Sequence, residues 1–206
     1  MSWHFDEALL EPVARWWRFT VGFRCIPHRR SLILADLGCG PEIRFFHYCQ
    51  KHRLGFKQSI GIDPLISSTK KIRLERDQRV KIITRPLVKK INLPTQSVDV
   101  VTGFAFLEHI DHPQEILRDS LRILKPGGIL ILTTPTPPAK TVLEFLAYQL
   151  RLISQREIRE HKNYFNRETL LKLLSSHGAN YQIRHTYFER GLNNLLIIKK
   201  RPTKVD

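Results

Sequence analysis

The sequence predicts an α/β fold built on a mainly parallel sheet, and three observations carry this prediction. Apolar runs of strand length alternate along the chain with amphipathic segments of helix length. The first run ends at two closely spaced glycines, Gly38 and Gly40, as strand-turn-helix units do. The last two runs are separated by only three residues, which indicates an antiparallel hairpin. A chain of 206 residues has the length of one domain.

The first half of the chain contains an opening helix and three strand-helix units. Ser2 to Arg18 has the period of a helix, with Phe5, Leu9, Val13 and Trp16 or Trp17 on one apolar face. Three strands are expected after it, at Ser31 to Asp36, Ser59 to Asp63 and Val80 to Thr84. A helix is expected from Pro41 toward His52, because proline suits a first helical turn, and a charged helix is expected after Pro64.

The second half continues the alternation and then closes with the hairpin. Helices are expected at Gln114 to Leu124, Thr141 to Ile153 and Arg167 to His177, the last with Asn166 as its N-cap. The sequence Lys125-Pro126-Gly127-Gly128 stops the first of these helices. Strands are expected at Ser97 to Thr102, Gly128 to Thr134, Tyr181 to Phe188 and Leu192 to Lys199.

Composition excludes several classes of protein. Three cysteines, with no CxxC pair and no histidines at zinc-ligand spacing, argue against a disulfide framework, and no metal is expected. The most apolar helical stretch, Val142 to Ile153, is shorter than the ~20 residues of a membrane span. The N-terminus lacks the basic region of a secretory signal, so a cytoplasmic protein is expected. A net charge of +15 would attract nucleic acid, anionic lipid or phosphorylated sugars.

The glycine turn carries the strongest chemical signal. In a parallel sheet it lies at the carboxyl edge, and its glycines let a ligand approach the backbone. Glu42 and Ile43 depart from the GxGxxG pattern of dinucleotide sites, and carboxylates at Asp36 and Glu42 would repel a pyrophosphate. Asp63, at the end of the second strand, is placed to accept hydrogen bonds from ribose hydroxyls. Together these residues favour a nucleoside with a cationic tail and no phosphate, which describes S-adenosylmethionine.

The chain resembles the class I S-adenosylmethionine-dependent methyltransferases, in particular the small-molecule and lipid methyltransferases with a DLGCGxG motif. Five stretches in the same order carry the resemblance: Leu34 to Gly40, Ile60 to Pro64, Leu93-Pro94 before Ser97 to Val101, Leu107 to Ile110, and Leu124 to Gly128. The resemblance implies a Rossmann-like, seven-stranded, mostly parallel sheet with a C-terminal antiparallel hairpin and helices on both faces.

The resemblance also assigns parts of the chain to parts of the function. We expect a single domain over residues 1–206, with an N-terminal helical extension at 1–30, a cofactor-binding core at 31–134 and substrate-side helices at 135–178. In the core it places Asp36, Gly38, Cys39 and Gly40 against the methionine part of the cofactor, Asp63 on the ribose, Pro64 beside the adenine, and Phe104 and Ala105 at the sulfonium end.

Two departures from the family pattern affect the cofactor site. Glu42 stands where the family usually has a third glycine, so the loop is stiffer. Lys89 and Lys90 stand where an acidic residue usually binds the adenine amino group. Either backbone groups hold the adenine here, or the affinity for the cofactor is weak.

The acceptor side is defined less sharply. Methyl transfer is mainly a matter of alignment, and a general base is needed only for a hydroxyl or carbon acid. His109 is the candidate base, with a helix-cap or supporting role as its alternative. His161, Tyr164 and Phe165 resemble a substrate-side segment of the family, with aromatic core packing as the alternative.

We therefore expect a methyltransferase that uses S-adenosylmethionine on a small-molecule or lipid-linked acceptor, at oxygen or carbon. Gly103-Phe104-Ala105-Phe106 is unlike the loops that methylate base amines, so nucleic acid is the less favoured partner despite the charge. An anionic membrane surface is a further candidate partner. The sequence does not define the oligomeric state. The alternatives are an RNA methyltransferase that uses the basic surface and a non-catalytic scaffold with a degenerate cofactor pocket.

Overall fold

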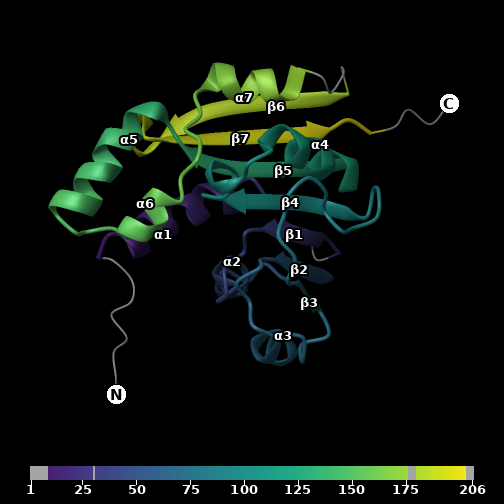
Figure 1. Ribbon diagram of the computed structural model, residues 1–206. Coiled ribbons are helices and arrows are strands. Elements are labelled where there is room, and N and C mark those ends of the chain that lie inside the picture. The colour runs from purple at the N-terminus through teal and green to yellow at the C-terminus, as the bar shows by residue number, and fades with distance from the viewer. Residues whose placement is uncertain (1–8, 30, 176–179, 203–206) are drawn as a thin grey trace.

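Seven strands form one mixed sheet in the computed structural model, which describes residues 9–29, 31–175 and 180–202 (Figure 1). The strand order is β3-β2-β1-β4-β5-β7-β6. The strands are β1 (Ile33–Leu37), β2 (Gln58–Ile62), β3 (Val80–Ile83), β4 (Val98–Phe104), β5 (Leu124–Pro135), β6 (Tyr181–Phe188) and β7 (Asn193–Lys200). The first five are parallel, while β7 pairs antiparallel with both β5 and β6. The predicted sheet with its terminal hairpin is confirmed.

Helices cover both faces of this sheet, as predicted. The elements are α1 (Glu11–Phe23), α2 (Arg44–Lys51), α3 (Ser68–Leu74), η1 (Leu107–His109), α4 (Pro113–Ile123), α5 (Pro137–Glu144), η2 (Phe145–Gln149), α6 (Gln155–Arg159), α7 (Arg167–Leu174) and η4 (Glu189–Gly191). One core cluster joins the sheet to α4 and α7, and a second joins the opposite face to α1 and α2. Alternate residues of β5 and β7 contribute to the two clusters, as do Leu34 and Ala35 in β1.

The functional edge follows from the strand order. β1 lies between β2 and β4, so the order of the strands reverses beside it. Asp36 is in register with Gly61 on β2 and with Thr102 on β4. The carboxyl ends of these three strands therefore meet at one edge, and a crevice at such a reversal is where open α/β sheets bind ligands.

The structure corrects the expected helix boundaries near the glycine turn. The helix expected from Pro41 begins only at Arg44, because Ile43 takes a left-handed backbone conformation with φ of 40°. Residues 41–43 instead prolong the turn, and a β-branched residue at positive φ marks a constrained backbone.

The opening helix also differs from expectation. It runs over Glu11–Phe23 rather than ending at Arg18, and residues 2–8 of the expected helix lie outside the described chain. Phe19 packs against Phe104 at the end of β4 and Phe45 on α2, and Gly22 lies against the Phe104 ring. The apolar face that contains Val13, Trp16 and Trp17 points outward instead of into the core.

The substrate-side segment breaks into shorter pieces than the sequence indicates. The helix expected at Thr141 to Ile153 appears as α5 followed by the π-helical turn η2, and α6 is an addition that no sequence signal predicted. Asn166 caps α7 as expected, with its Oδ1 accepting from the Thr169 N–H at 2.8 Å. None of the described helices is both long enough and apolar enough to cross a membrane.

Candidate functional site

The turn after β1 forms a cradle of backbone at the carboxyl edge. Gly38 and Gly40 have φ of 67° and 68°, a left-handed conformation that glycine adopts without a steric penalty. The Gly38 N–H donates to the Ile62 carbonyl at 2.9 Å, and the Gly40 N–H donates to Asp63 Oδ2 at 2.9 Å. These two bonds tie the turn to the end of β2. No atom lies within 4 Å of a Cβ built on Gly40, so open space faces the loop there.

Two buried carboxyl groups flank this cradle. Asp36 is 3% exposed and Asp63 is 7% exposed. The Thr102 hydroxyl donates to Asp36 Oδ1 at 2.7 Å, and the Leu65 N–H donates to Asp63 Oδ1 at 2.8 Å. Burial, with a further contribution from the Asp63 charge, raises the pKa of Asp36 to about 7. A cationic group bound in the cradle would stabilise the ionised form of Asp36, so these residues fit an ammonium-bearing ligand better than a phosphate.

A small cavity lies beside the carboxyl ends of β2 and β3. Its volume is about 210 Å³, and it is lined by Ile62, Ile83, Arg85, Pro86, Leu87, Lys90 and Asn92. This is where the predicted ribose ligand Asp63 would direct an adenine, and none of these residues carries a carboxylate. Lys89 turns away and lies 3.8 Å from Glu115. Pro64 is exposed next to Asp63 at the same edge.

A larger cavity lies elsewhere and is not the candidate site. It has a volume of about 440 Å³ and opens between α2 and α3, behind Glu42 and near Arg73. Size alone would favour it, but the groups suited to a nucleoside lie at the carboxyl edge of the sheet. Lys70 pairs with Glu42 across the margin of this larger cavity, so α3 is attached to the glycine loop.

Two aromatic side chains at and after the end of β4, Phe104 and Phe106, point in different directions. Phe104 turns away from the cradle into a cluster with Phe19 and Phe45, at ring-centroid distances of 5.4 and 4.5 Å. Ala105 follows with φ of 47° and reverses the chain. Phe106 then packs on the glycine loop, where a Cβ on Gly38 would lie 2.6 Å from its ring. Of the two residues predicted at the sulfonium end, Ala105 therefore stands nearer the cradle than the Phe104 ring.

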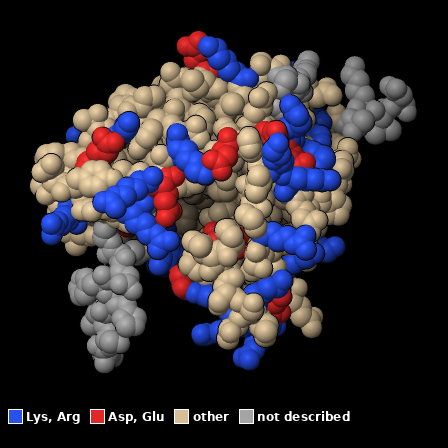
Figure 2. Space-filling view, in the orientation of Figure 1, with Lys and Arg blue, Asp and Glu red and all other residues tan. Residues whose placement is uncertain are grey.

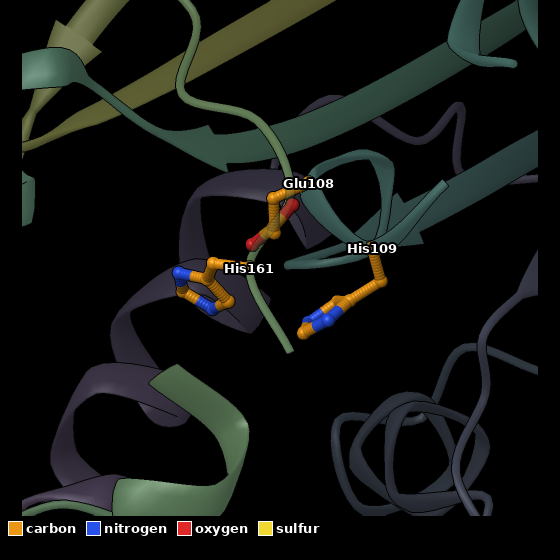
Figure 3. Close-up of side chains that lie close together, drawn as sticks. All are labelled: Glu108, His109 and His161. Carbon is orange, nitrogen blue, oxygen red and sulfur yellow. The ribbon is translucent and has the colours of Figure 1, made fainter. Parts of the chain in front are cut away.

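The loop after β4 brings Glu108 and His109 to a segment far away in sequence. The Glu108 carbonyl accepts hydrogen bonds from the Lys162 and Asn163 N–H groups at 2.8 and 3.1 Å. Figure 3 shows the Glu108 carboxylate pointing toward the His161 ring, with His109 beside both. The His109 and His161 ring centroids are 4.9 Å apart. Two backbone bonds thus bring the predicted base and the predicted substrate-side segment together.

The Glu108 side chain is a buried acid without a hydrogen-bond partner among the described residues. It is 0% exposed, and neither carboxylate oxygen has a hydrogen-bond partner among the described residues. Burial raises its pKa to about 7. The backbone N–H of Glu108, the Arg18 charge and the Thr134 hydroxyl oppose this rise, although the geometry gives Thr134 no hydrogen bond.

The two histidines beside it stay neutral near pH 7. Burial lowers the pKa of His109, and burial together with the neighbouring His109 lowers the pKa of His161 to about 4. His109 Nδ1 lies 3.2 Å from the Glu160 carbonyl. Because a carbonyl only accepts, Nδ1 carries the proton and Nε2 keeps a free lone pair. His161 Nδ1 lies 3.1 Å from the Tyr164 hydroxyl, and burial raises the pKa of Tyr164 to about 12.

This cluster can accept a proton or hold a cation. One donor atom from each of Glu108, His109 and His161 lies within 4.8 Å of the other two, which is close to the spacing that a divalent cation bridges. The remaining predicted substrate-side residue does not join it. Phe165 is 5% exposed in the core, and its carbonyl accepts from Asn194 Nδ2 at 2.7 Å.

Sequence reasoning missed the residues that support this site. Thr102 binds Asp36 from the neighbouring strand, and Glu160 orients His109 from 51 positions away. Phe106 covers the glycine loop. Only the position of Thr102 at the end of a predicted strand offered a signal, because the other two contacts depend on tertiary folding.

Comparison with known proteins finds a matching family model and several similar sequences. A family model described as a methyltransferase domain matches residues 10–186. A ubiquinone biosynthesis O-methyltransferase from Serratia proteamaculans is 26% identical over 187 residues, which cover 82% of this chain and 77% of the relative. The one from Aliivibrio fischeri is 23% identical, covering 78% and 76%. The mitochondrial one from Candida albicans is 29% identical, but the match spans 50% of this chain and 32% of that relative.

Solved structures share the fold at low sequence identity. An S-adenosylmethionine-dependent methyltransferase from Mesorhizobium loti aligns with a TM-score of 0.66 at 18% identity, covering 93% of this chain and all of the other. The [4+2]-cyclase SpnF aligns with a TM-score of 0.65 at 15% identity, covering 98% of this chain and 86% of the other. Since one of these is a cyclase, the shared fold alone does not specify a reaction.

Proposed function

The chain belongs to the family of class I S-adenosylmethionine-dependent methyltransferases, and on this premise we propose that it methylates a hydroxyl group of a lipid-linked small molecule. It is an enzyme of this family with S-adenosylmethionine as its cofactor. The relatives named for ubiquinone biosynthesis O-methylation support a lipid-linked acceptor and favour oxygen over carbon. We further propose that the enzyme acts in the cytoplasm and reaches its acceptor at a membrane surface.

The residues at the carboxyl edge fit the cofactor. S-adenosylmethionine supplies a methyl group on a positively charged sulfur, which is already activated for transfer to a nucleophile. Asp36 and the backbone of Gly38 to Gly40 would hold its methionine end, and Asp63 would accept from its ribose hydroxyls. The 210 Å³ cavity would take the adenine, with Asn92 and the backbone around Leu87 in place of an acidic residue.

The observation that carries the choice of a hydroxyl acceptor is the state of His109. A phenol or enol must lose its proton as its oxygen attacks the methyl carbon, and His109 Nε2 carries the lone pair that can take it. The Glu160 carbonyl fixes the tautomer and the direction of the ring. Since His109 directly follows the loop at the sulfonium end, we assign it as the general base.

Glu108 and His161 support this base. A buried Glu108 close to His109 stabilises the imidazolium that forms when the proton arrives. His161, neutral and hydrogen-bonded to Tyr164, would face the acceptor from the opposite side. Glu108 is therefore a positioning residue, while His109 acts on the acceptor.

The test is methyl transfer to a phenol with a short isoprenoid tail, measured by mass spectrometry with labelled S-adenosylmethionine. We expect His109→Gln to lower kcat by about 10²–10⁴-fold with little change in KM or in cofactor affinity. His47→Gln, an exposed histidine on α2, is the matched control and should keep full activity.

Three outcomes of this assay would contradict parts of the proposal. Unchanged kcat in His109→Gln would exclude a base role for His109. Loss of activity after EDTA treatment, restored by a divalent cation, would show that the cluster holds a metal and does not act as a proton acceptor. Label found in RNA and not in the phenol would move the reaction to a different acceptor class.

A further inference from the structure

The outward face of α1 is apolar, which is the reverse of the usual arrangement. Leu9, Pro12, Val13, Trp16 and Trp17 are the exposed positions along residues 9–18, and they have the i, i+3, i+4, i+7, i+8 spacing of one helix face. Leu9 is 72% exposed, while Trp16 and Trp17 are 57% and 43% exposed. A helix face open to water normally carries polar residues, so an exposed apolar face with two tryptophans indicates a partner surface.

A second exposed apolar surface lies next to it. Phe145, Tyr148 and Leu150, on and after η2, are 53%, 38% and 48% exposed. The two elements meet, because the Leu10 N–H donates to the Leu152 carbonyl at 3.1 Å. Leu10 also packs on the small buried cluster of Ala147, Ile153 and Ile158. In Figure 1, α1, α5 and α6 gather at the same end of the molecule. We call these two surfaces together, Leu9 to Trp17 and Phe145 to Leu150, the α1–η2 rim.

Basic side chains border the rim. Arg151, Arg156 and Arg159 follow η2, and the Arg159 guanidinium lies 5.9 Å from the centroid of the Tyr148 ring. Figure 2 shows Lys and Arg side chains, with Asp and Glu side chains among them, at this end of the molecule. Arg156 shares its charge with Glu160 at 3.0 Å, but the whole chain carries a net charge of +15. The rim thus combines apolar and aromatic side chains with positive charge.

We propose that the α1–η2 rim docks on the surface of a membrane that contains anionic lipids. Tryptophan and tyrosine favour the boundary between headgroups and acyl chains, and arginines attract anionic headgroups. A second copy of this chain would bring two basic borders together, which charge repulsion disfavours. The inference deepens the proposed function and rests on it for the lipid-linked acceptor, since α6 leads directly into His161 and Tyr164 at the site. Docking there brings the acceptor side of the site to the bilayer.

The test is sedimentation of the full chain with phosphatidylcholine vesicles that contain or lack about 30% phosphatidylglycerol, near 150 mM salt. We expect binding to the anionic vesicles and a blue shift of tryptophan fluorescence. The double variant Trp16→Ser, Trp17→Ser should bind at least about tenfold more weakly. Leu65→Ser with Ile72→Ser, which are 70% and 66% exposed at the α3 end, is the matched control and should bind like the unchanged protein.

A charge variant separates the two contributions. Arg151→Gln with Arg156→Gln should weaken binding to anionic vesicles and reduce its salt dependence. The inference is overturned by absence of binding to anionic vesicles, or by an equal loss in the α3 control. It is also overturned if sedimentation velocity shows a dimer that the tryptophan variant dissociates, because the rim would then be an interface between copies.

The proposed function can fail without the docking inference, and the reverse also holds. The tryptophan variant should methylate a soluble short-tailed phenol at the unchanged rate and lose activity only on acceptor embedded in vesicles. If vesicles are bound but no phenol is methylated, the docking surface stands and the acceptor class is wrong. If soluble phenol is methylated but vesicles are not bound, the docking inference is the part that fails.

Discussion

Asp36 is the side chain through which cofactor binding would be coupled to protonation. Its carboxyl group is buried beside the glycine loop, and its pKa is raised to about 7 by burial, with Asp63 adding to the effect. Without a cation beside it the acid is therefore about half protonated near pH 7, whereas a bound ammonium group favours the ionised form. Cofactor binding should release a proton from Asp36 near neutral pH, so the affinity should rise as the pH increases through 7.

The same shift predicts how stability depends on pH. A carboxyl group whose pKa is higher in the folded than in the unfolded chain destabilises the fold as it ionises, so its unfavourable effect grows from about pH 4 to pH 7. Asp36→Asn removes this effect. We expect the variant to be more stable than the unchanged protein at pH 8, by roughly 1–3 kcal/mol, and closer to it at pH 5.

Urea unfolding of both proteins at pH 5 and pH 8 checks the predicted difference in stability. Calorimetry checks whether Asp36→Asn also loses affinity for S-adenosylmethionine, as the proposed role of Asp36 predicts. A variant that is less stable at both pH values would show that Asp36 is ionised in the folded protein. The account of the cradle as a cation site would then need another group to receive the ammonium.

Single residues also show what the sequence could predict. Asp36, Gly38, Gly40 and Asp63 were predicted because a strand end and a glycine turn form a local pattern of fixed spacing. The pairing of His109 with Glu160 could not be predicted, because it joins segments 51 residues apart. The direction of the Phe104 ring could not be predicted either, because it depends on packing against α1 and α2.

At the scale of elements, α1 is placed by a close contact with β4. A Cβ built on Gly22 would lie 2.2 Å from the Phe104 ring, which is itself held by Phe19 and Phe45. We expect Gly22→Ala to lower the free energy of unfolding by about 1–3 kcal/mol through overpacking, although alanine favours helices over glycine.

Gly55→Ala is the matched control, since no atom lies within 4 Å of its added Cβ. It should change the free energy of unfolding by less than about 0.5 kcal/mol or raise it slightly. Thermal and urea unfolding of both variants check the prediction. A stabilised Gly22→Ala would mean that α1 packs less closely on β4 than described.

Element types were predictable where the pattern was strong, and boundaries were not. The hairpin strand Tyr181–Phe188 appears with the predicted bounds, because its period is clear and its turn is short. The expected helix at Thr141 to Ile153 instead gives way to a π-helical turn and α6, since local apolar content does not show where tertiary packing bends a helix. The outward apolar face of α1 was hidden for a related reason, because periodicity identifies a face without saying which way it points.

The whole molecule is organised around the reversal in strand order beside β1. Two core clusters hold the sheet from both faces and leave its carboxyl edge free for ligands. The proposed cofactor residues lie at the ends of β1 and β2, the proposed base follows β4, and the proposed acceptor side is the segment between β5 and β6. The mostly parallel sheet with its terminal hairpin was within reach of the sequence because alternating strands and helices constrain topology strongly. The contacts between the proposed base and its supporting residues depend on long-range packing, so they could not be predicted from the sequence.

The most direct test of the cofactor site is titration calorimetry with S-adenosylmethionine on the full chain, on Asp63→Ala and on the surface control Lys172→Ala, whose side chain is exposed on α7. We predict binding of one equivalent by the unchanged chain and by Lys172→Ala. Asp63→Ala should lose at least about 100-fold in affinity with unchanged circular dichroism, because the buried Asp63 carboxylate would accept hydrogen bonds from the ribose hydroxyls. Absence of heat from the unchanged chain at millimolar S-adenosylmethionine, or equal affinity in Asp63→Ala, would contradict the account.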